Sequence, residues 1–309
     1  MAMADSNTTQ RTDLMSLNPD RSNPLDDAAV LKAPHANSIR HRQRSDIGFF
    51  MLLAGSSACF VVLIVAMLLA DIRFTSWEAF EKAFAKPEIR ASLRLTLLTC
   101  TVSAILAIGV AIPLGYALAR YQFTGRWLID TIVDIPLMLP PLVLGLSLLI
   151  LFHLPIHGWQ LENWLRGNAG FGVTYRWPAI ILAQFVVASA FAVRTMRVTF
   201  EQINPRAEDV ARTLGCTRAQ AFVHVALPQA RNGLIAALTV AWARSLGEFG
   251  PILVFAGATR MKTEVLSTSV FLELNVGDVD AAVAVSLAMV AIAVSVVLAL
   301  RIMGTRISA

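Results

Sequence analysis

Apolar residues gather along this chain in six long stretches separated by polar segments, at about 47–70, 95–119, 135–152, 177–193, 232–256 and 281–300. Each stretch holds roughly 17–25 residues, enough for a helix to cross the ~30 Å hydrocarbon core of a bilayer. Helices are favoured over strands because an isolated strand would leave backbone hydrogen-bonding groups unpaired in lipid. The pattern therefore predicts an all-α membrane protein with six transmembrane helices in a domain spanning residues 47–306.

The composition supports a membrane protein. Hydrophobic residues make up 56% of the 309 positions and charged residues 15%, with a mean hydropathy of +0.62. A soluble domain usually carries about 25% charged residues, so an ordinary soluble enzyme is excluded. The first 46 residues are different, because they are polar and lack the apolar core of a secretory signal. We expect residues 1–46 to form a disordered cytoplasmic tail.

The distribution of cations predicts the orientation in the membrane. With the N-terminus in the cytoplasm, 16 of the 26 lysines and arginines fall on the inner side and nine on the outer side. Cytoplasmic loops of membrane proteins carry such an excess. We therefore expect a multi-pass membrane protein with both termini cytoplasmic. The net charge of +5 is explained by these loops, and no nucleic-acid partner is expected.

The longest inner segment lies between the fourth and fifth stretches, and its local chemistry predicts a short helix. Asn204 is a favourable N-cap and Pro205 a favourable first helical residue. The acids Glu208 and Asp209 favour the positive end of that helix. Gly215 adopts the left-handed conformation readily, so the helix is expected to end there.

A second short helix follows this glycine. Thr217 and Gln220 have the spacing of a capping box, and the helix is expected to stop before Pro228. A rigid helix–glycine–helix element suits docking into a groove on another protein. A surface hairpin without any partner fits the residues equally well.

The loop over residues 201–229 resembles the EAA motif of ABC importer permeases. That motif is written Glu-Ala-Ala, three residues, Gly, nine residues and Ile-x-Leu-Pro. The spacing from the glycine to Leu-Pro is intact here, whereas Asp replaces the leading Glu, Val the first Ala and Val the Ile. The resemblance implies a cytoplasmic coupling helix that docks on an ATP-binding subunit, with contacts from Asp209, Ala211, Gly215, Leu227 and Pro228.

The resemblance covers about residues 90–305. Within it, Gly247-Glu248-Phe249-Gly250 is similar to a signature of the molybdate, sulfate and tungstate branch. It implies a type I ABC importer permease bundle in which two copies, a homodimer, form one pathway. The implied partners are two ATP-binding cassette subunits and a periplasmic substrate-binding protein, and the implied location is the bacterial inner (plasma) membrane. The implied cargo is a tetrahedral oxyanion, molybdate or tungstate first and sulfate second.

The sequence indicates a non-catalytic transport subunit. It contains no Gly-Lys dipeptide and therefore no Walker A phosphate loop. We expect no cofactor on this chain, with ATP and Mg²⁺ on the partner subunit. His153 and His157 have a spacing that can hold a metal on a helix. Pro155 lies between them and no third ligand is evident, so no metal site is expected.

Two charges and two prolines are candidates for a translocation pathway or gate. Arg244 and Glu248 lie four residues apart in the fifth stretch, where an unpaired charge costs at least ~2.5 kcal/mol. They either form a neutral pair that locks helix packing or line an anion route, since arginine suits oxyanions. Pro140 and Pro141 either kink the third stretch for packing or shape a path.

Other functions fit the chain less well. A permease of the same superfamily for another cargo, such as a phosphonate, thiamine, a polyamine or ferric ion, is the nearest alternative. An ion-coupled secondary transporter is expected to show internal repeats and several intramembrane ion ligands. An intramembrane enzyme is expected to show a His-Glu-x-x-His motif or a Ser–His pair within the stretches. We find neither set of features in the sequence.

Overall fold

The computed structural model of this chain describes residues 36–155 and 160–308. All regular secondary structure within these ranges is helical, which confirms the all-α prediction. The chain divides into two units, residues 1–66 and 67–309. Helix α1, Ala36–Phe74, begins in the first unit and ends in the second. Residues 1–35, most of the segment predicted to be a disordered tail, lie outside the described residues.

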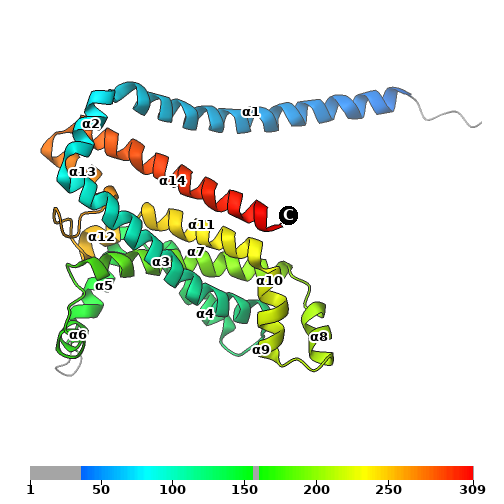
Figure 1. Ribbon diagram of the computed structural model, residues 1–309. Coiled ribbons are helices and arrows are strands. Elements are labelled where there is room, and N and C mark those ends of the chain that lie inside the picture. Colours follow the sequence, from blue (N-terminus) through cyan, green and yellow to red (C-terminus); the bar gives the residue numbers. More distant parts are fainter. Residues whose placement is uncertain (1–35, 156–159, 309) are drawn as a thin grey trace, which may run out of the picture. The chain divides into compact units, whose positions relative to one another are not determined.

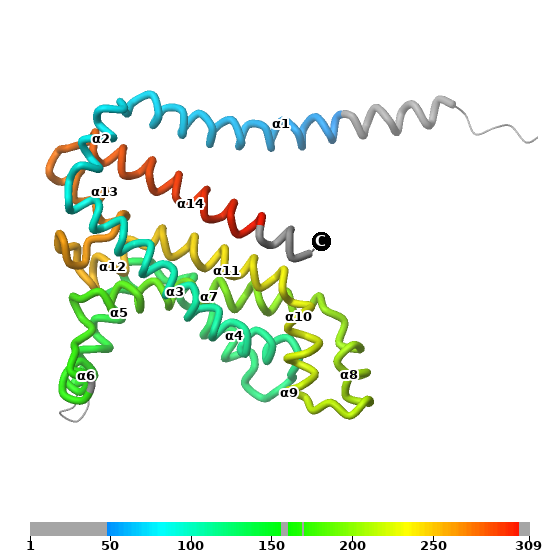
Figure 2. Tube along the Cα trace, viewed as in Figure 1, coloured from blue at the N-terminus to red at the C-terminus, as the bar shows by residue number. Residues whose placement is uncertain are grey.

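The second unit contains the other helices, which Figure 1 and Figure 2 show along the chain. Their bounds are α2 Trp77–Ala85, α3 Pro87–Arg120, α4 Arg126–Met138, α5 Pro141–His153, α6 Leu161–Ala169, α7 Trp177–Gln202, α8 Arg206–Thr213, α9 Arg218–Ala221, α10 Leu227–Gln229, α11 Arg231–Leu246, α12 Gly250–Phe255, α13 Leu266–Val276 and α14 Val279–Ser308.

Four helices are long and apolar enough to cross a membrane, judged by length and composition over the described residues: Gly48–Phe74 of α1, α3, α7 and Val279–Ile302 of α14. They match the first, second, fourth and sixth predicted stretches. The pair α4 and α5 adds a fifth span if the two helices count as one. The third and fifth predicted stretches are each broken rather than continuous.

The break in the third stretch lies at two consecutive prolines. Helix α4 ends at Met138, Leu139 and Pro140 are extended, and α5 begins at Pro141. The two helices are bent by 115° to each other. A residue that precedes proline is biased away from the helical conformation. Leu139 and Pro140 each precede a proline. The kink predicted in the stretch 135–152 is therefore present, but it is a full break between two helices rather than a bend within one.

The break in the fifth stretch separates α11 from α12. Glu248 lies inside this break, so the expectation that Arg244 and Glu248 share one helix is wrong. Two carbonyl groups at the break accept hydrogen bonds from side chains of other helices. The Gln184 side chain donates to the Ser245 carbonyl at 3.2 Å, and the Ser267 hydroxyl donates to the Glu248 carbonyl at 2.7 Å. Irregular backbone at membrane depth requires such partners.

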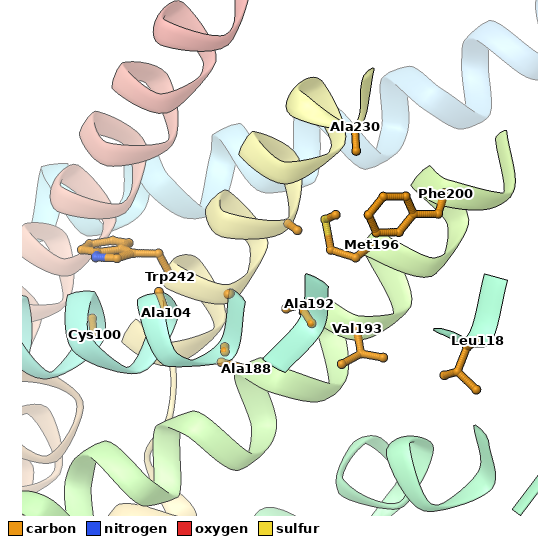
Figure 3. Packing of buried hydrophobic residues seen from close by; sticks show 14 of the residues in the cluster. Cys100, Ala104, Leu118, Ala188, Ala192, Val193, Met196, Phe200, Ala230 and Trp242 are labelled. Carbon is orange, nitrogen blue, oxygen red and sulfur yellow. The ribbon is translucent and has the colours of Figure 1, made fainter. Parts of the chain in front are cut away.

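Helices α3, α7 and α11 pack side by side through small residues (Figure 3). Ala104 of α3 and Ala188 and Ala192 of α7 are fully buried. A Cβ atom added to Gly115 would lie 2.9 Å from the Cβ atom of Met196. Small residues let helix backbones approach closely in lipid, where close packing rather than the hydrophobic effect drives association.

The segment from α8 to α10, residues 206–229, follows the carboxyl end of α7 and is called the loop element below. Helices α5, α6 and α12 lie toward the amino end of α7 (Figure 1). Helix α6 is fixed to the loop that follows it by Glu162, which is buried. Its carboxylate accepts hydrogen bonds from the backbone N–H groups of Val173 at 3.0 Å and Thr174 at 3.2 Å. One buried carboxylate therefore holds α6 and the following loop together.

Candidate functional site

The two broken spans meet at their breaks. Helices α5 and α12, which follow the breaks, pack against each other through two reciprocal contacts between a glycine and a proline. A Cβ atom on Gly250 would lie 2.9 Å from the Cβ atom of Pro141, and one on Gly145 would lie 2.8 Å from the Cα atom of Pro251. Both distances are shorter than real Cβ contacts allow, so each glycine is required for this close approach.

A cavity of about 130 Å³ adjoins this contact. Three of the four predicted pathway residues, Pro141, Arg244 and Glu248, line it together. Pro140 is the N-cap of α5 and does not line the cavity. The remaining walls are mostly apolar and come from α4, α5 and α7, through Pro136, Leu137, Leu139, Leu144, Val187 and Phe191.

The only charged residues lining this cavity, Arg244 and Glu248, form an ion pair. Nη2 of Arg244 lies 2.7 Å from Oε1 of Glu248, and the Glu248 side chain is 1% exposed. Among the described residues, no donor approaches that Oε1 with hydrogen-bond geometry. The contact is therefore close but poorly directed. The Arg244 guanidinium also lies over the Phe191 ring, 5.7 Å from its centroid.

This geometry suits a small anion. A guanidinium offers several planar N–H donors to an oxyanion, and the Arg244 side chain remains 32% exposed. The amino end of α5, represented by Pro141 and Leu144, lines the same space, and the amino end of a helix favours negative charge. Phe191 and Val187 also line the cavity, and they could not be predicted because nothing local in a sequence marks an apolar residue that faces a cavity.

The first loop helix begins one residue later than predicted, with Pro205 rather than Asn204 at the N-cap position. Helix α8 begins at Arg206, and Oδ1 of Asn204 accepts a hydrogen bond from its backbone N–H at 3.0 Å. Gly215 has a φ angle of 96°, which confirms the predicted left-handed end of the helix. The Cys216 N–H group donates to the Ala211 carbonyl at 3.1 Å, so the last turn is closed.

The second loop helix departs from its prediction. The capping box of Thr217 and Gln220 is confirmed, but the helix does not stop before Pro228. A π-helical turn over Phe222–Ala226 leads into α10, which contains the proline. Proline in an α-helix clashes with the carbonyl four residues earlier. The wider turn before Pro228 relieves that clash, so the helix continues.

A buried carboxylate fastens the loop element to α3. Oε2 of Glu208 accepts a hydrogen bond from the Tyr116 hydroxyl at 2.5 Å, and Oε1 accepts one from Nε of Arg120 at 2.9 Å. Arg120 also donates to the Ile203 carbonyl at 2.9 Å. In the sequence Glu208 is marked only as a helix-end acid, because its partners lie 88 and 92 residues away.

The outward side of the loop element carries exposed apolar residues. Val210 and Leu214, four residues apart on α8, are 58% and 81% exposed. Asp209 beside them is also exposed, whereas Leu227 is half-buried and Pro228 exposed. The predicted coupling residues therefore lie on one segment of the chain but differ in their exposure. His157, named above for its metal spacing, lies outside the described residues.

The sequence of this chain is similar to those of known proteins. Residues 111–309 match the family described as binding-protein-dependent transport system inner membrane component. The sulfate transport system permease protein CysT of Escherichia coli is 36% identical over 76% of this chain and 85% of its own length. The molybdenum transport system permease protein ModB of Mycobacterium bovis is 33% identical over 77% of this chain and 89% of its own.

Solved structures show the same fold. A bacterial alginate ABC transporter, in complex with its alginate-bound periplasmic protein, has a chain with a TM-score of 0.67 and 22% identity, covering 87% of this chain and 97% of that one. The methionine ABC transporter MetNI has one with a TM-score of 0.53 and 20% identity, covering 71% and 94%. The chain therefore belongs to the binding-protein-dependent transport system inner membrane components, the multi-pass permeases of ABC importers.

Proposed function

We propose that this chain lines the translocation pathway of an ABC importer for a tetrahedral oxyanion of the sulfate, molybdate and tungstate class. The observation that carries the proposal is the Arg244 guanidinium, which opens onto a small apolar cavity where two broken spans meet. The permeases that this chain resembles are named for sulfate and for molybdate or tungstate. Both the site and the relatives therefore favour a small divalent oxyanion over a large or cationic cargo.

The broken spans fit a six-crossing arrangement. In this proposal α4 with α5 forms the third crossing and α11 with α12 the fifth. Discontinuous helices place backbone ends and polar side chains at substrate sites inside membranes. Two copies of the chain, as a homodimer, enclose one pathway, with Arg244 and Glu248 of each copy facing it. Pro140 and Pro141 set the bend that brings the start of α5 to the cavity.

The loop element is proposed to couple this pathway to ATP hydrolysis. Val210 and Leu214 present an exposed apolar edge that suits a groove on an ATP-binding cassette subunit, with Asp209 beside it. The other proposed contacts, Ala211, Gly215, Leu227 and Pro228, shape the same element. Motion of α8 passes to α3 through Glu208, which Tyr116 and Arg120 hold.

The remaining partners follow from this arrangement. Two ATP-binding subunits bind ATP and Mg²⁺ on the cytoplasmic side, where both termini of this chain lie. A periplasmic binding protein delivers the anion to the outer face. The chain itself is a non-catalytic transport subunit that binds no cofactor.

Uptake competition tests the proposal. The complete complex is reconstituted into vesicles with ATP inside and the binding protein outside, and uptake of radiolabelled sulfate and of radiolabelled molybdate is followed. We expect ATP-dependent uptake of at least one anion, with competition by unlabelled molybdate, tungstate or sulfate but not by chloride. Uptake of neither anion, with ATPase activity intact, contradicts the proposed cargo.

A further inference from the structure

A second set of charges lies between α4 and α7, outside the residues considered so far. The two helices pack together, and their facing charges form three rungs whose reverse order along the chain shows that the helices are antiparallel. The Arg194 and Asp134 side chains approach to 3.9 Å, Arg197 forms an ion pair with Asp130, and Arg126 and Glu201 approach to 3.9 Å. The rungs are formed by Arg126, Asp130 and Asp134 of α4 and by Arg194, Arg197 and Glu201 of α7.

These rungs continue directly from the cavity. Phe191 of α7 and Pro136 of α4 line the cavity. Arg194 follows Phe191 by three residues, close to one turn or about 4.5 Å along the helix. Asp134 precedes Pro136 by two residues, in the same direction because the helices are antiparallel. A row of arginines therefore runs from Arg244 through Arg194 toward the loop element.

The exposure of the first rung indicates that it faces an aqueous or protein-lined space. Helix α7 begins at Trp177. At 1.5 Å per residue, Arg194 lies about 26 Å along the helix from that start. If α7 enters the hydrocarbon core near Trp177, Arg194 lies near the inner edge of its ~30 Å thickness. Its side chain is 65% exposed and that of Asp134 is 27% exposed. Charges at this depth avoid lipid and mark ion pathways or polar interfaces.

We propose that Arg194 and Arg197 are a relay through which the oxyanion leaves the Arg244 cavity toward the cytoplasm. This inference rests on the proposed function and extends it to residues outside the cavity. Each arginine is held by a resident carboxylate, Asp134 or Asp130, which the passing anion displaces and which then returns. The anion thus moves between guanidinium groups without any of them standing unpaired.

The contacts of the rungs fit such an exchange. Three arginines and three acids make the row neutral as a whole, so it does not trap an anion. At 3.9 Å, Arg194 and Asp134 are too far apart for a hydrogen bond, and exposed ion pairs contribute little stability. Conduction requires sites that bind weakly and in series. Arg197, which also lies 2.9 Å from Glu201, is held more firmly and is the later site.

The competing explanation is a static clamp that holds α4 against α7. A clamp loses the same contact whichever partner is removed, so Arg194→Gln and Asp134→Asn would have the same effect. In a relay the two changes act in opposite directions. Without Arg194 the anion loses a donor group, whereas without Asp134 it loses a competitor.

The experiment measures equilibrium retention of radiolabelled sulfate and molybdate by the purified complex without binding protein, together with uptake in vesicles. We expect Asp134→Asn and Asp130→Asn to raise retention about fivefold, the factor that roughly 1 kcal/mol represents, and to slow release. Arg194→Gln should lower both retention and uptake by a similar factor. The control Glu78→Gln removes one exposed acid of an outer-side pair and should change neither.

The outcomes separate the two proposals. If the wild-type complex takes up anion but retention is lower in both Arg194→Gln and Asp134→Asn, the charges form a clamp. That result overturns the relay and leaves the proposed function standing. If Arg194→Gln does not assemble, Asp134→Asn and Asp130→Asn decide between the two explanations. The relay is also overturned if anion retention fails to rise in either of these variants. Absence of wild-type uptake of both anions overturns the proposed function, and the relay with it.

Discussion

Pro141 occupies the space that a side chain on Gly250 would need. The Cβ atom of such a side chain would lie 2.9 Å from Cβ of Pro141 and 3.1 Å from the Leu142 nitrogen. Neither the proline ring nor the backbone can rotate away. The contact between the two broken spans, and with it the cavity beside them, therefore depends on the absence of one methyl group.

Gly250→Ala should consequently destabilise the protein. Overpacking a tight site typically costs about 1–3 kcal/mol, so we expect a lower melting temperature of the purified complex and lower uptake. Gly247→Ala is the matched control, because a Cβ atom there would have no neighbour closer than 3.9 Å. Equal melting temperatures for the two variants would contradict the importance of the contact.

Glu208→Gln should loosen the loop element from α3. The change weakens the interactions with Tyr116 and Arg120 and leaves the Arg120 charge largely uncompensated, at a cost of roughly 3 kcal/mol for a buried pair. We expect faster hydrogen exchange over residues 203–221 and less transport per ATP hydrolysed. Asp209→Asn, an exposed neighbour on the same helix, should leave the exchange unchanged. Identical exchange in the two variants would show that Glu208 is not the anchor.

Arg244→Ala should reduce oxyanion uptake while leaving association with the ATP-binding subunit intact. Loss of a charge-assisted hydrogen bond of about 1.5–3 kcal/mol corresponds to at least a tenfold reduction. The control is the double variant Arg244→Ala/Glu248→Gln, which leaves no uncompensated carboxylate. If the pair only locks packing, the double variant should recover uptake; if Arg244 binds the anion, uptake should stay low.

The α6 region should loosen in acid. Burial alone would raise the pKa of Glu162, but hydrogen bonds from Val173, Thr174 and Arg166 hold that pKa below its usual value. The carboxylate therefore stabilises this region fully above the ordinary glutamate pKa of about 4.3. The stabilisation is lost as the pH falls from there through the lower folded-state value.

Hydrogen exchange over residues 161–174, corrected for its intrinsic pH dependence, measures this effect at neutral pH and near pH 4. Protection should fall in acid for the wild type. Glu162→Gln should show weak protection at both pH values. Unchanged wild-type protection in acid would mean that this acid does not order the loop.

The sequence predicted the spans better than their interruptions. Hydropathy identifies a span because its length must match the bilayer, and this constraint is local. The interruption near Glu248 depends on α12 packing against α5, and Gly250 gives no sign in the sequence that Pro141 will be its neighbour. Pro140 and Pro141 predicted the position of a kink, but not its size of 115°, because two prolines interrupt a helix without fixing the direction in which the next one leaves.

In the candidate site, too, local relationships could be predicted from the sequence, whereas contacts between distant residues could not. The spacing of Arg244 and Glu248 offered pairing as one of two alternatives, and the pair forms even though Glu248 lies outside the helix. Glu208 was missed as an anchor because its partners are 88 and 92 residues away. Asp130 and Asp134 were missed because they precede the third apolar stretch, where acids are expected to be solvated.

The left-handed glycine between α8 and α9 provides the sharpest test of coupling. Gly215 has a φ angle of 96° and open space around the position of a Cβ atom, so a substitution there affects backbone conformation rather than packing. Valine disfavours this conformation by roughly 1–2 kcal/mol or more, whereas asparagine tolerates it. Gly215→Val should therefore distort the end of α8, and Gly215→Asn should not.

In the reconstituted complex, we expect Gly215→Val to retain the ATP-binding subunit but to lose most of the ATPase stimulation by the binding protein, and with it uptake. Gly215→Asn should stay near the wild type in both measurements. Because both variants add a side chain at the same exposed site, a difference between them can come only from the backbone. Intact stimulation in Gly215→Val would show that this turn does not carry the movement of α8 into the membrane domain.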